Sequence, residues 1–338
     1  MAGKRQHFVP RFLQEGFASH QVGDQAFTWV YRTQRPSFNS NISNVGVEGN
    51  FYSDGDDSSA DELITKAERR YSKLISELRL SGPGPVTHND LPELIVHFET
   101  RTRHLRKSFL ESGTFVVDRL LEFLSDERKL EEFLLRRLRS DPSLIRNALK
   151  RDFDERLLEP ILSLIEPLFP LMVAAQKSQI AGTIARLRGS IDLPFAHAAK
   201  LGHVKALRAE LAPAVRLERL QGLKFRIEPM EAEPLNLGDS IVVFRVGGTR
   251  AFKTFLEKGD DLEAVLLPIS SRLLLVGARV AASLPSDLND VVARCSLEYF
   301  IASQNGAAND RRQTLIGSDA AILSKSELEE IITSVLNE

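Results

Sequence analysis

The sequence predicts an α+β fold in which a small mixed or antiparallel sheet, built from the N- and C-terminal parts, carries a large central helical layer. Three observations lead to this class. Residues 1–58 hold short β-rich segments and turns, residues 59–190 place apolar side chains at helical spacing, and residues 191–338 mix both patterns. Since strands from both ends of a chain can share one sheet around inserted helices, we expect a single domain over residues 1–338.

The N-terminal part is expected to begin with an extended segment at residues 7–9, followed by a short helical turn at 12–17. A strand is expected at 26–31, where β-rich residues alternate after the turn signal Gly23-Asp24. The remaining residues of this sub-region are irregular and rich in Asn and Gly.

Helical spacing begins at Ser59, where the sequence Ser-Ala-Asp-Glu resembles a capping box. This helix is expected to reach residue 78 and to stop at the Gly- and Pro-rich residues 81–85. The next helix is expected over 91–105, with Asp90 as its N-cap and a proline in its first turn. The same periodicity predicts further helices over 115–124, 127–139, 143–150, 154–169 and 172–188.

The C-terminal part returns to a mixture of both patterns. Short apolar segments flanked by Gly, Pro and Ser predict strands at 225–229, 240–246, 264–269 and 273–276. Amphipathic spacing predicts helices at 203–211, 288–303 and 324–336.

The bulk composition is that of an ordinary soluble protein. The chain has 338 residues, of which 43% are hydrophobic and 27% charged, and its net charge of -2 does not indicate a polyanionic partner for the whole molecule. The charge is uneven, because residues 171–226 carry ten Lys and Arg against three Asp and Glu, whereas residues 227–338 carry ten against seventeen. The two segments could attract each other or present opposite faces.

The single cysteine, Cys295, allows no disulfide within the chain and no thiolate metal site. It lies in a helical pattern, where a buried structural thiol is expected. The N-terminus has no apolar run of signal-peptide length, and we found no apolar stretch long enough to span a bilayer. We therefore expect a cytoplasmic protein without a membrane partner, and we leave the oligomeric state open.

The pair Gln6-His7, inside an otherwise apolar entry strand, is the best candidate for a site. A neutral imidazole can accept or donate a proton near pH 7, so His7 could act as a general acid or base. Because side chains alternate along a strand, Gln6 should point away from His7, and both should line one pocket only if the strand kinks. The alternative is that the pair satisfies backbone groups and anchors the N-terminus.

Arg101 is predicted on the apolar face of the 91–105 helix, and Arg106 at its end. A guanidinium directed inward requires a carboxylate or a phosphate, because an unpaired buried charge is costly. We expect an internal ion pair, with Glu68 and Glu48 as candidate partners. The alternative is a ligand that carries a phosphate group.

Other motifs with known chemistry are missing from the sequence. His97 and His104 lie seven residues apart rather than the four of a helical metal pair, so we predict no metal site and expect His97 at the surface. His203 is also expected at a solvated surface. No Walker loop, dinucleotide-binding glycine motif or nucleophile elbow occurs, and the cofactor stays open.

The opening Gln-His-Phe-Val-Pro, with Phe12, Leu13 and Phe17 after it, resembles the start of a bacterial family known as a domain of unknown function, numbered 4238. The resemblance continues through most of the chain, in segments 42–52, 62–68, 98–106, 237–240, 267–270 and 287–289. The resemblance is weaker at segment 237–240 and the residue after it, where Gly238 replaces the usual serine and Ile241 replaces a proline.

The family has no assigned reaction, so the resemblance implies an architecture and a set of recurring polar residues. These are His7, Gln6, Glu68 and Asp239 as candidate catalytic residues, and Arg101 and Arg106 as candidate substrate-binding residues. We expect them to form a shared cluster.

Two functional hypotheses follow. The first is a phosphodiester-acting hydrolase, a nuclease or nucleotide hydrolase of a defence or toxin effector, in which His7 works with Arg101 and Arg106 on a nucleic acid or nucleotide. The second is a non-catalytic binding or sensing module in which the polar residues are structural. Convergence of His7, Arg101 and Asp239 in an open cleft would favour the hydrolase. Separation of these residues, or their burial in mutual pairs, would favour the binding module.

Overall fold

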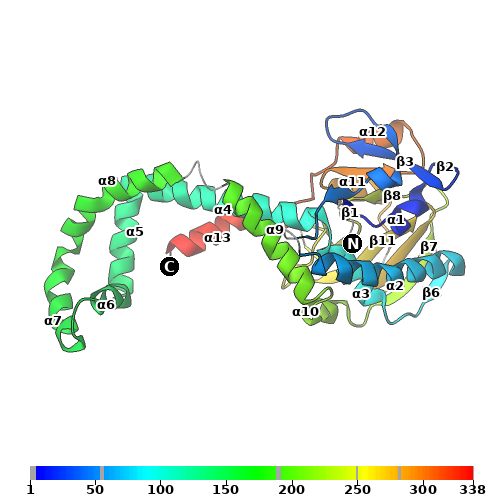
Figure 1. Ribbon diagram of the computed structural model, residues 1–338. Coiled ribbons are helices and arrows are strands. Elements are labelled where there is room, and N and C mark those ends of the chain that lie inside the picture. The colour runs from blue at the N-terminus through cyan, green and yellow to red at the C-terminus, as the bar shows by residue number, and fades with distance from the viewer. Residues whose placement is uncertain (1–4, 54–56, 188–191, 249, 281–282, 338) are drawn as a thin grey trace. The chain divides into compact units, whose positions relative to one another are not determined.

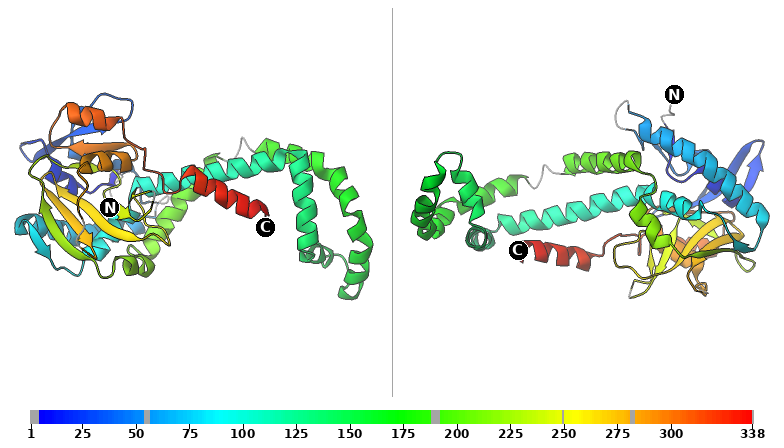
Figure 2. Two further views of the ribbon diagram at one scale, coloured as in Figure 1. Left: turned by 180° about the vertical axis from the view of Figure 1, so that it is seen from behind. Right: turned by 90° about the horizontal axis from the view of Figure 1, so that it is seen from below.

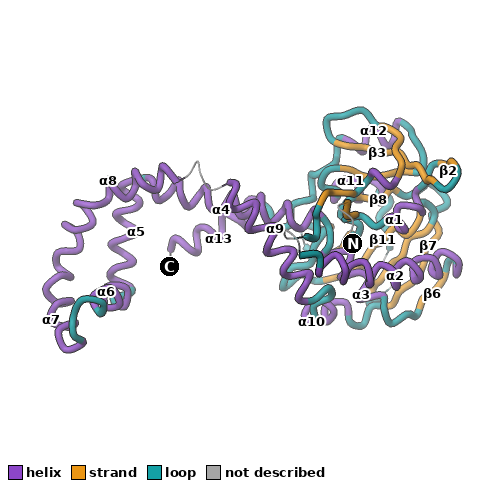
Figure 3. The backbone as a smooth tube through the Cα atoms, in the orientation of Figure 1, coloured by secondary structure: helices purple, strands orange, loops and turns teal. Residues whose placement is uncertain are grey.

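The structure is a computed structural model that describes residues 5–53, 57–187, 192–248, 250–280 and 283–337. The chain forms two compact units. The first, residues 1–109 and 199–322, is here called the sheet unit, and the second, residues 110–198 and 323–338, the helical unit. Figures 1 and 3 show that the strands belong to the sheet unit. The predicted α+β class is confirmed, although the predicted helical sub-region 59–190 is divided between the two units.

A six-stranded antiparallel sheet forms the larger layer of the sheet unit, in the order β10-β9-β11-β12-β7-β6. Its central strands are long and buried on both faces, which explains their near-continuous runs of Leu, Ile and Val. The strands are β6 (Gly84–Val86), β7 (Lys224–Pro229), β9 (Val243–Val246), β10 (Phe252–Lys253), β11 (Leu262–Ser270) and β12 (Leu273–Ala278).

A second antiparallel sheet, in the order β2-β3-β13-β8 with β4 added beside β3, joins the two ends of the chain. Val30 of β3 lies opposite Ile301 of β13, so the predicted sharing of a sheet by the N- and C-terminal parts is confirmed. The strands are β2 (His20–Val22), β3 (Gln25–Arg32), β4 (Phe38–Asn41), β8 (Asn236–Gly238) and β13 (Tyr299–Ala302).

The predicted helix over residues 288–303 is wrong in its second half. Helix α11 (Leu288–Cys295) ends at Ser296, and the residues after it become the central strand β13. The carboxylate of Asp239 accepts hydrogen bonds from the backbone N–H groups of residues 297, 298 and 299, and continuation of the helix would require those groups. Pairing of β13 on both sides then completes the change.

The predicted helix over residues 91–105 is also interrupted. Helix α3 (Leu91–Thr100) ends at Arg101, and α4 (Arg103–Ser125) begins two residues later. The break is stabilised by side chains, because His203 bonds to the carbonyl oxygen of Thr100 and the Tyr52 hydroxyl donates to that of Arg101. Helix α2 (Ser59–Ser81), by contrast, matches its prediction closely.

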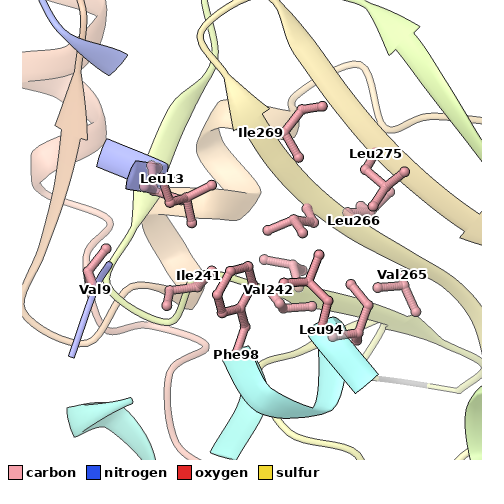
Figure 4. Packing of buried hydrophobic residues seen from close by; sticks show 14 of the residues in the cluster. Val9, Leu13, Leu94, Phe98, Ile241, Val242, Val265, Leu266, Ile269 and Leu275 are labelled. Atoms are coloured by element: carbon pink, nitrogen blue, oxygen red, sulfur yellow. The ribbon is translucent and has the colours of Figure 1, made fainter. Parts of the chain in front are cut away.

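Helices α2 and α3 cover the large sheet and close the main core. Figure 2, right, shows α2 on one side of the sheet unit, with the yellow strands on the far side. Figure 4 shows Leu94 and Phe98 of α3 close to Val242, which directly precedes β9, and on the side of Val265 in β11, and all four are buried. Burial of this apolar surface is the main stabilising contribution to the sheet unit.

The remaining elements of the sheet unit are short. They are β1 (Arg5–His7) paired with β5 (Val47–Gly49), the helices α1 (Arg11–Gln14), α10 (Ala214–Leu217) and α12 (Ala307–Gln313), and the 3₁₀ turns Glu15–Phe17, Ile42–Asn44 and Glu218–Leu220. Helix α9 (Asp192–Ala209) begins in the helical unit and ends in the sheet unit.

The helical unit is built around α5, which packs against α8 through buried Leu130, Val173 and Ala181 and an ion pair of Lys177 with Glu131. Its elements are the end of α4, α5 (Glu127–Ser140), α6 (Ser143–Leu149), α7 (Glu155–Ile165), the 3₁₀ turn η3 (Glu166–Leu168), α8 (Phe169–Leu187) and α13 (Lys325–Asn337). One helix, Glu155–Leu187, is by length and composition apolar enough to cross a membrane, so the expected lack of a membrane partner stays a prediction.

We predict that Phe300→Ala in the shared sheet lowers the free energy of unfolding by about 3–5 kcal/mol, because the substitution leaves a cavity in the core. Phe300 is fully buried, and its ring stacks on Tyr31 at 4.9 Å between centroids. Urea denaturation would measure the loss. The control is Phe38→Ala, which changes a side chain of β4 that is 40% exposed. An equal loss of stability in both variants would contradict the assignment of β13 to the core.

Candidate functional site

A polar cavity of about 230 Å³ lies between β1, the start of α1, α2 and the end of α3. Residues 61, 64, 65 and 68 of α2 line it, because their spacing places them on one helical face. Most of the other lining side chains are charged or polar, namely Arg5, Gln6, His7, Arg11, Tyr52 and Arg101.

Arg101 forms the inner wall of this cavity and is fully buried. Its guanidinium pairs with the Glu68 carboxylate at 2.6 Å and donates to the carbonyl oxygen of His7 at 2.6 Å. It also donates to the Tyr52 hydroxyl at 3.2 Å and lies 3.1 Å from Nε2 of His97. The predicted ion pair of Arg101 with Glu68 is therefore confirmed.

The electrostatics of this cluster follow from burial and pairing. Burial disfavours the Arg101 charge, but Tyr52 and Glu68 more than offset this and hold the pKa of Arg101 above its ordinary value. Burial raises the pKa of Tyr52 to about 12, so its hydroxyl stays protonated and donates to the Arg101 carbonyl. Arg101 is a cation with polar partners in four chain segments, and it holds those segments together.

Gln6 is almost fully buried and holds the loop after β5. Its amide oxygen accepts from the backbone N–H of Tyr52 at 2.6 Å, and its amide nitrogen donates to the Ser53 hydroxyl at 2.9 Å. Contrary to the expectation from strand alternation, Gln6 and His7 both line the cavity. The physical reason is that β1 is three residues long and the chain bends directly after His7.

Part of the hydrogen-bonding capacity of His7 is unused. Its Nε2 is shielded from solvent and has no hydrogen-bond partner among the described residues. Burial, and then the charge of Arg11, lower the pKa of His7 below 6.5, while Glu68 acts in the opposite direction. The imidazole is therefore neutral at pH 7 and able to accept a proton.

Arg11 and Asp61 are among the lining residues that were missed in the sequence. Arg11 is exposed, and its guanidinium makes no hydrogen bond or ion pair with any other residue in the described part of the chain. Burial raises the pKa of Asp61, and the nearby charge of Glu68 adds to this. The spacing of Asp61 and Glu68, two turns apart on one helix, is a signal that could have found the former.

Arg106 does not line the cavity and belongs to a separate ionic network. It pairs with Glu48 at 2.5 Å, as expected, and its guanidinium lies 4.2 Å from the centre of the Phe51 ring. Glu48 also lies near Arg103, which pairs with Glu298. This network joins the start of α4 to β5 and to the residue that precedes β13.

Asp239 is buried and lies outside the cavity lining as well. Burial raises its pKa to about 6, and the hydrogen bonds from the backbone N–H groups of Leu297, Glu298 and Tyr299 act in the opposite direction. These bonds, at 2.7, 2.8 and 3.3 Å, give Asp239 a structural task at the start of β13.

The predicted cluster is thus divided between two regions. The cavity brings together His7, Gln6, Glu68 and Arg101, but it includes neither Arg106 nor Asp239. Among these six, His7 Nε2 and Arg106 Nη1 are buried nitrogens without a hydrogen-bond partner in the described residues, and of the two only His7 lines the cavity. Gln6, Arg101 and Asp239 are buried and paired.

The histidines expected at the surface are buried. His97 is fully buried, and burial holds its pKa well below 6.5, so its Nε2 can accept from Arg101. His203 bonds to the Thr100 carbonyl, and burial lowers its pKa to about 4. A single sequence could not reveal this, because both lie on helices with polar neighbours. Within the described residues, no group of three or more His, Cys, Asp or Glu side chains could hold a metal ion.

Comparison with known proteins identifies one family. The family described as "Protein of unknown function (DUF4238)" matches residues 5–186, which is more than half of the chain and includes every lining residue of the cavity. No curated protein and no solved structure matches the chain.

We predict that Arg101→Met lowers the free energy of unfolding by about 3–5 kcal/mol, because it leaves buried partners of a lost charge unsatisfied. The control is Arg69→Met, which changes an exposed residue of α2 that has no ion pair in the described residues, with an expected change below about 0.5 kcal/mol. Chemical denaturation compares the two, and equal stabilities would show that Arg101 is not structural.

We predict that His203 makes the sheet unit sensitive to acid. Its folded pKa of about 4 lies below the ordinary 6.5, so the unfolded chain binds more protons and stability falls as the pH drops through this window. Between pH 7 and pH 4 the wild type should lose about 3 kcal/mol more than His203→Gln. Urea denaturation at both pH values measures this, with exposed His88→Gln as a control that should behave as wild type.

Proposed function

The chain belongs to the DUF4238 family of proteins of unknown function, and we propose that its cavity binds a phosphodiester and that His7 hydrolyses it. The observation that carries the proposal is that one cavity is lined by two polar groups that have no bonding partner in the described residues. His7 has a buried nitrogen without a partner among the described residues, and Arg11 offers a cation that is not engaged there.

Under this proposal each group has a distinct task. Neutral His7 accepts a proton from the water that attacks phosphorus, the bond to the leaving oxygen breaks, and that oxygen takes the proton from His7. Arg11 balances the negative charge that develops on the phosphoryl oxygens. Since Nε2 is shielded from solvent, the His7 ring must turn toward the cavity when substrate binds.

The role expected for Arg101 is revised in this proposal. Its donors are already occupied by Glu68, Tyr52 and the His7 carbonyl, so the phosphate contact passes to Arg11, with Arg5 beside it. Arg101 instead positions His7 through its backbone. It is a positioning residue rather than a catalytic one.

The size of the cavity favours a small substrate, because its volume of about 230 Å³ lies below the roughly 300–1,000 Å³ of most ligand sites. The basic segment 171–226 gives little support to a long polyanion track. Several of its cations are engaged within the protein: Lys177 with Glu131, Arg208 with Asp57, Arg216 with Glu99, Arg219 with a backbone carbonyl, and Arg226 with Glu228. We therefore propose a nucleotide, or one phosphodiester of a single strand, within a nuclease-like cytoplasmic effector of defence.

The second candidate is a non-catalytic module that binds the same anion. It is favoured by the burial and pairing of Arg101 and Asp239, which is the arrangement expected of structural residues. The two candidates differ in whether His7 transfers a proton.

We predict that His7→Gln lowers kcat by about 100-fold or more on small phosphodiesters, because it removes the proton acceptor. Bis(p-nitrophenyl) phosphate, cyclic nucleotides and short single-stranded RNA and DNA would be assayed. Arg11→Ala should raise KM more than it lowers kcat. His20→Gln is a matched control, since His20 is exposed on β2 outside the cavity lining.

The pH profile provides an independent readout of the same residue. The base must be neutral, and the pKa of His7 lies below 6.5, so activity should persist at pH 7 and fall as the pH drops below that pKa. Activity of His7→Gln equal to wild type would refute the hydrolase. A wild type that binds nucleotides in calorimetry but turns none over would establish the binding module instead.

A further inference from the structure

The helix formed by α7, η3 and α8 in the helical unit has two apolar faces. One face packs inward, where Leu158, Phe169 and Val173 are buried. The other is open, with Leu164 73% and Leu171 69% exposed. Between Pro160 and Gln176 the helix carries a single charged residue, Glu166. Figure 1 shows the helix in green.

The apolar residues on the open face, most of them exposed and Ile161 partly exposed, follow a regular pattern. They recur at alternating spacings of four and three residues, which is the heptad pattern of a coiled-coil seam. The seam consists of Leu157, Ile161, Leu164, Leu168, Leu171 and Ala175. A seam of this kind fits the side chains of a second helix, whereas contact with lipid requires no such spacing.

The residues around the seam permit pairing with an identical helix. The positions directly beside it hold Leu, Pro, Ile, Met and Ala, so no like charges would face each other across a symmetric pair. Glu159 and Glu166 occupy the heptad position opposite the seam.

A membrane surface fits less well. By length and composition the helix Glu155–Leu187 could cross a membrane, and only 17% of its most apolar window is buried. However, it carries three acidic and three basic residues, so anionic headgroups would not attract it. Its inner face also packs on α5, a helix rich in Arg and Glu that hydrocarbon would not accept.

We propose that the seam of α7 and α8 is the interface through which two copies of this chain form a symmetric dimer. The inference goes beyond the proposed function and does not depend on it, because the seam and the cavity lie in different units. The seam is covered by its equivalent in the second copy.

The test uses the full chain in sedimentation equilibrium. Wild type should have twice the monomer mass of 37.8 kDa. The double variant Leu164→Asp with Leu171→Asp should be monomeric, with a dimer Kd raised by at least about 100-fold, because four charges would enter an apolar interface. Leu164→Ser, which disturbs the helix less, should weaken the dimer in the same direction.

The matched control is Leu80→Asp, which changes a leucine that is 87% exposed on α2, outside the seam, and should remain dimeric. Circular dichroism of each variant should equal that of wild type. The proposal is overturned if wild type is monomeric at all concentrations, or if the double variant dimerises as wild type does. It is also overturned if wild type is a monomer that floats with phosphatidylcholine vesicles.

Discussion

The buried charge of Arg101 is the constraint on which the arrangement of the site depends. A guanidinium without solvent must find partners for its donors, and these come from β1, the Tyr52 loop, α2 and α3. Four segments that are distant in sequence are therefore joined at one point. The cavity exists because the Arg101 guanidinium closes one side of it while α2 closes another.

This arrangement separates structural from chemical tasks among the polar residues. Glu68 and Arg101 form an ion pair, and Gln6 is hydrogen-bonded to Tyr52 and Ser53. Asp239 accepts hydrogen bonds from the backbone at the start of β13. His7 and Arg11 retain unused bonding capacity among the described residues. Chemistry in this cavity would therefore be carried by the residues that the buried network leaves free, and the network would keep them in position.

Local sequence patterns were sufficient to predict an element where its structure depends on residues close to it in the chain. The amphipathic spacing of α2 and the β-rich alternation of β3 were recognisable, and the inward position of Arg101 called for a carboxylate, which Glu68 supplies. They were insufficient where a distant side chain competes with the local backbone. The helix expected to reach residue 303 stops at Cys295 because the Asp239 carboxylate takes the N–H groups that would extend it.

The sequence by itself determined the family, the α+β class and the pairing needs of two arginines, and it singled out His7 as a candidate. Only the tertiary structure decided that Arg106 and Asp239 lie apart from the cavity, that His97 and His203 are buried and neutral, and that Arg11 and Asp61 join the site. The physical reason is that spacing along a chain reports which face of an element a side chain occupies. The partner that this face meets depends on packing between distant segments.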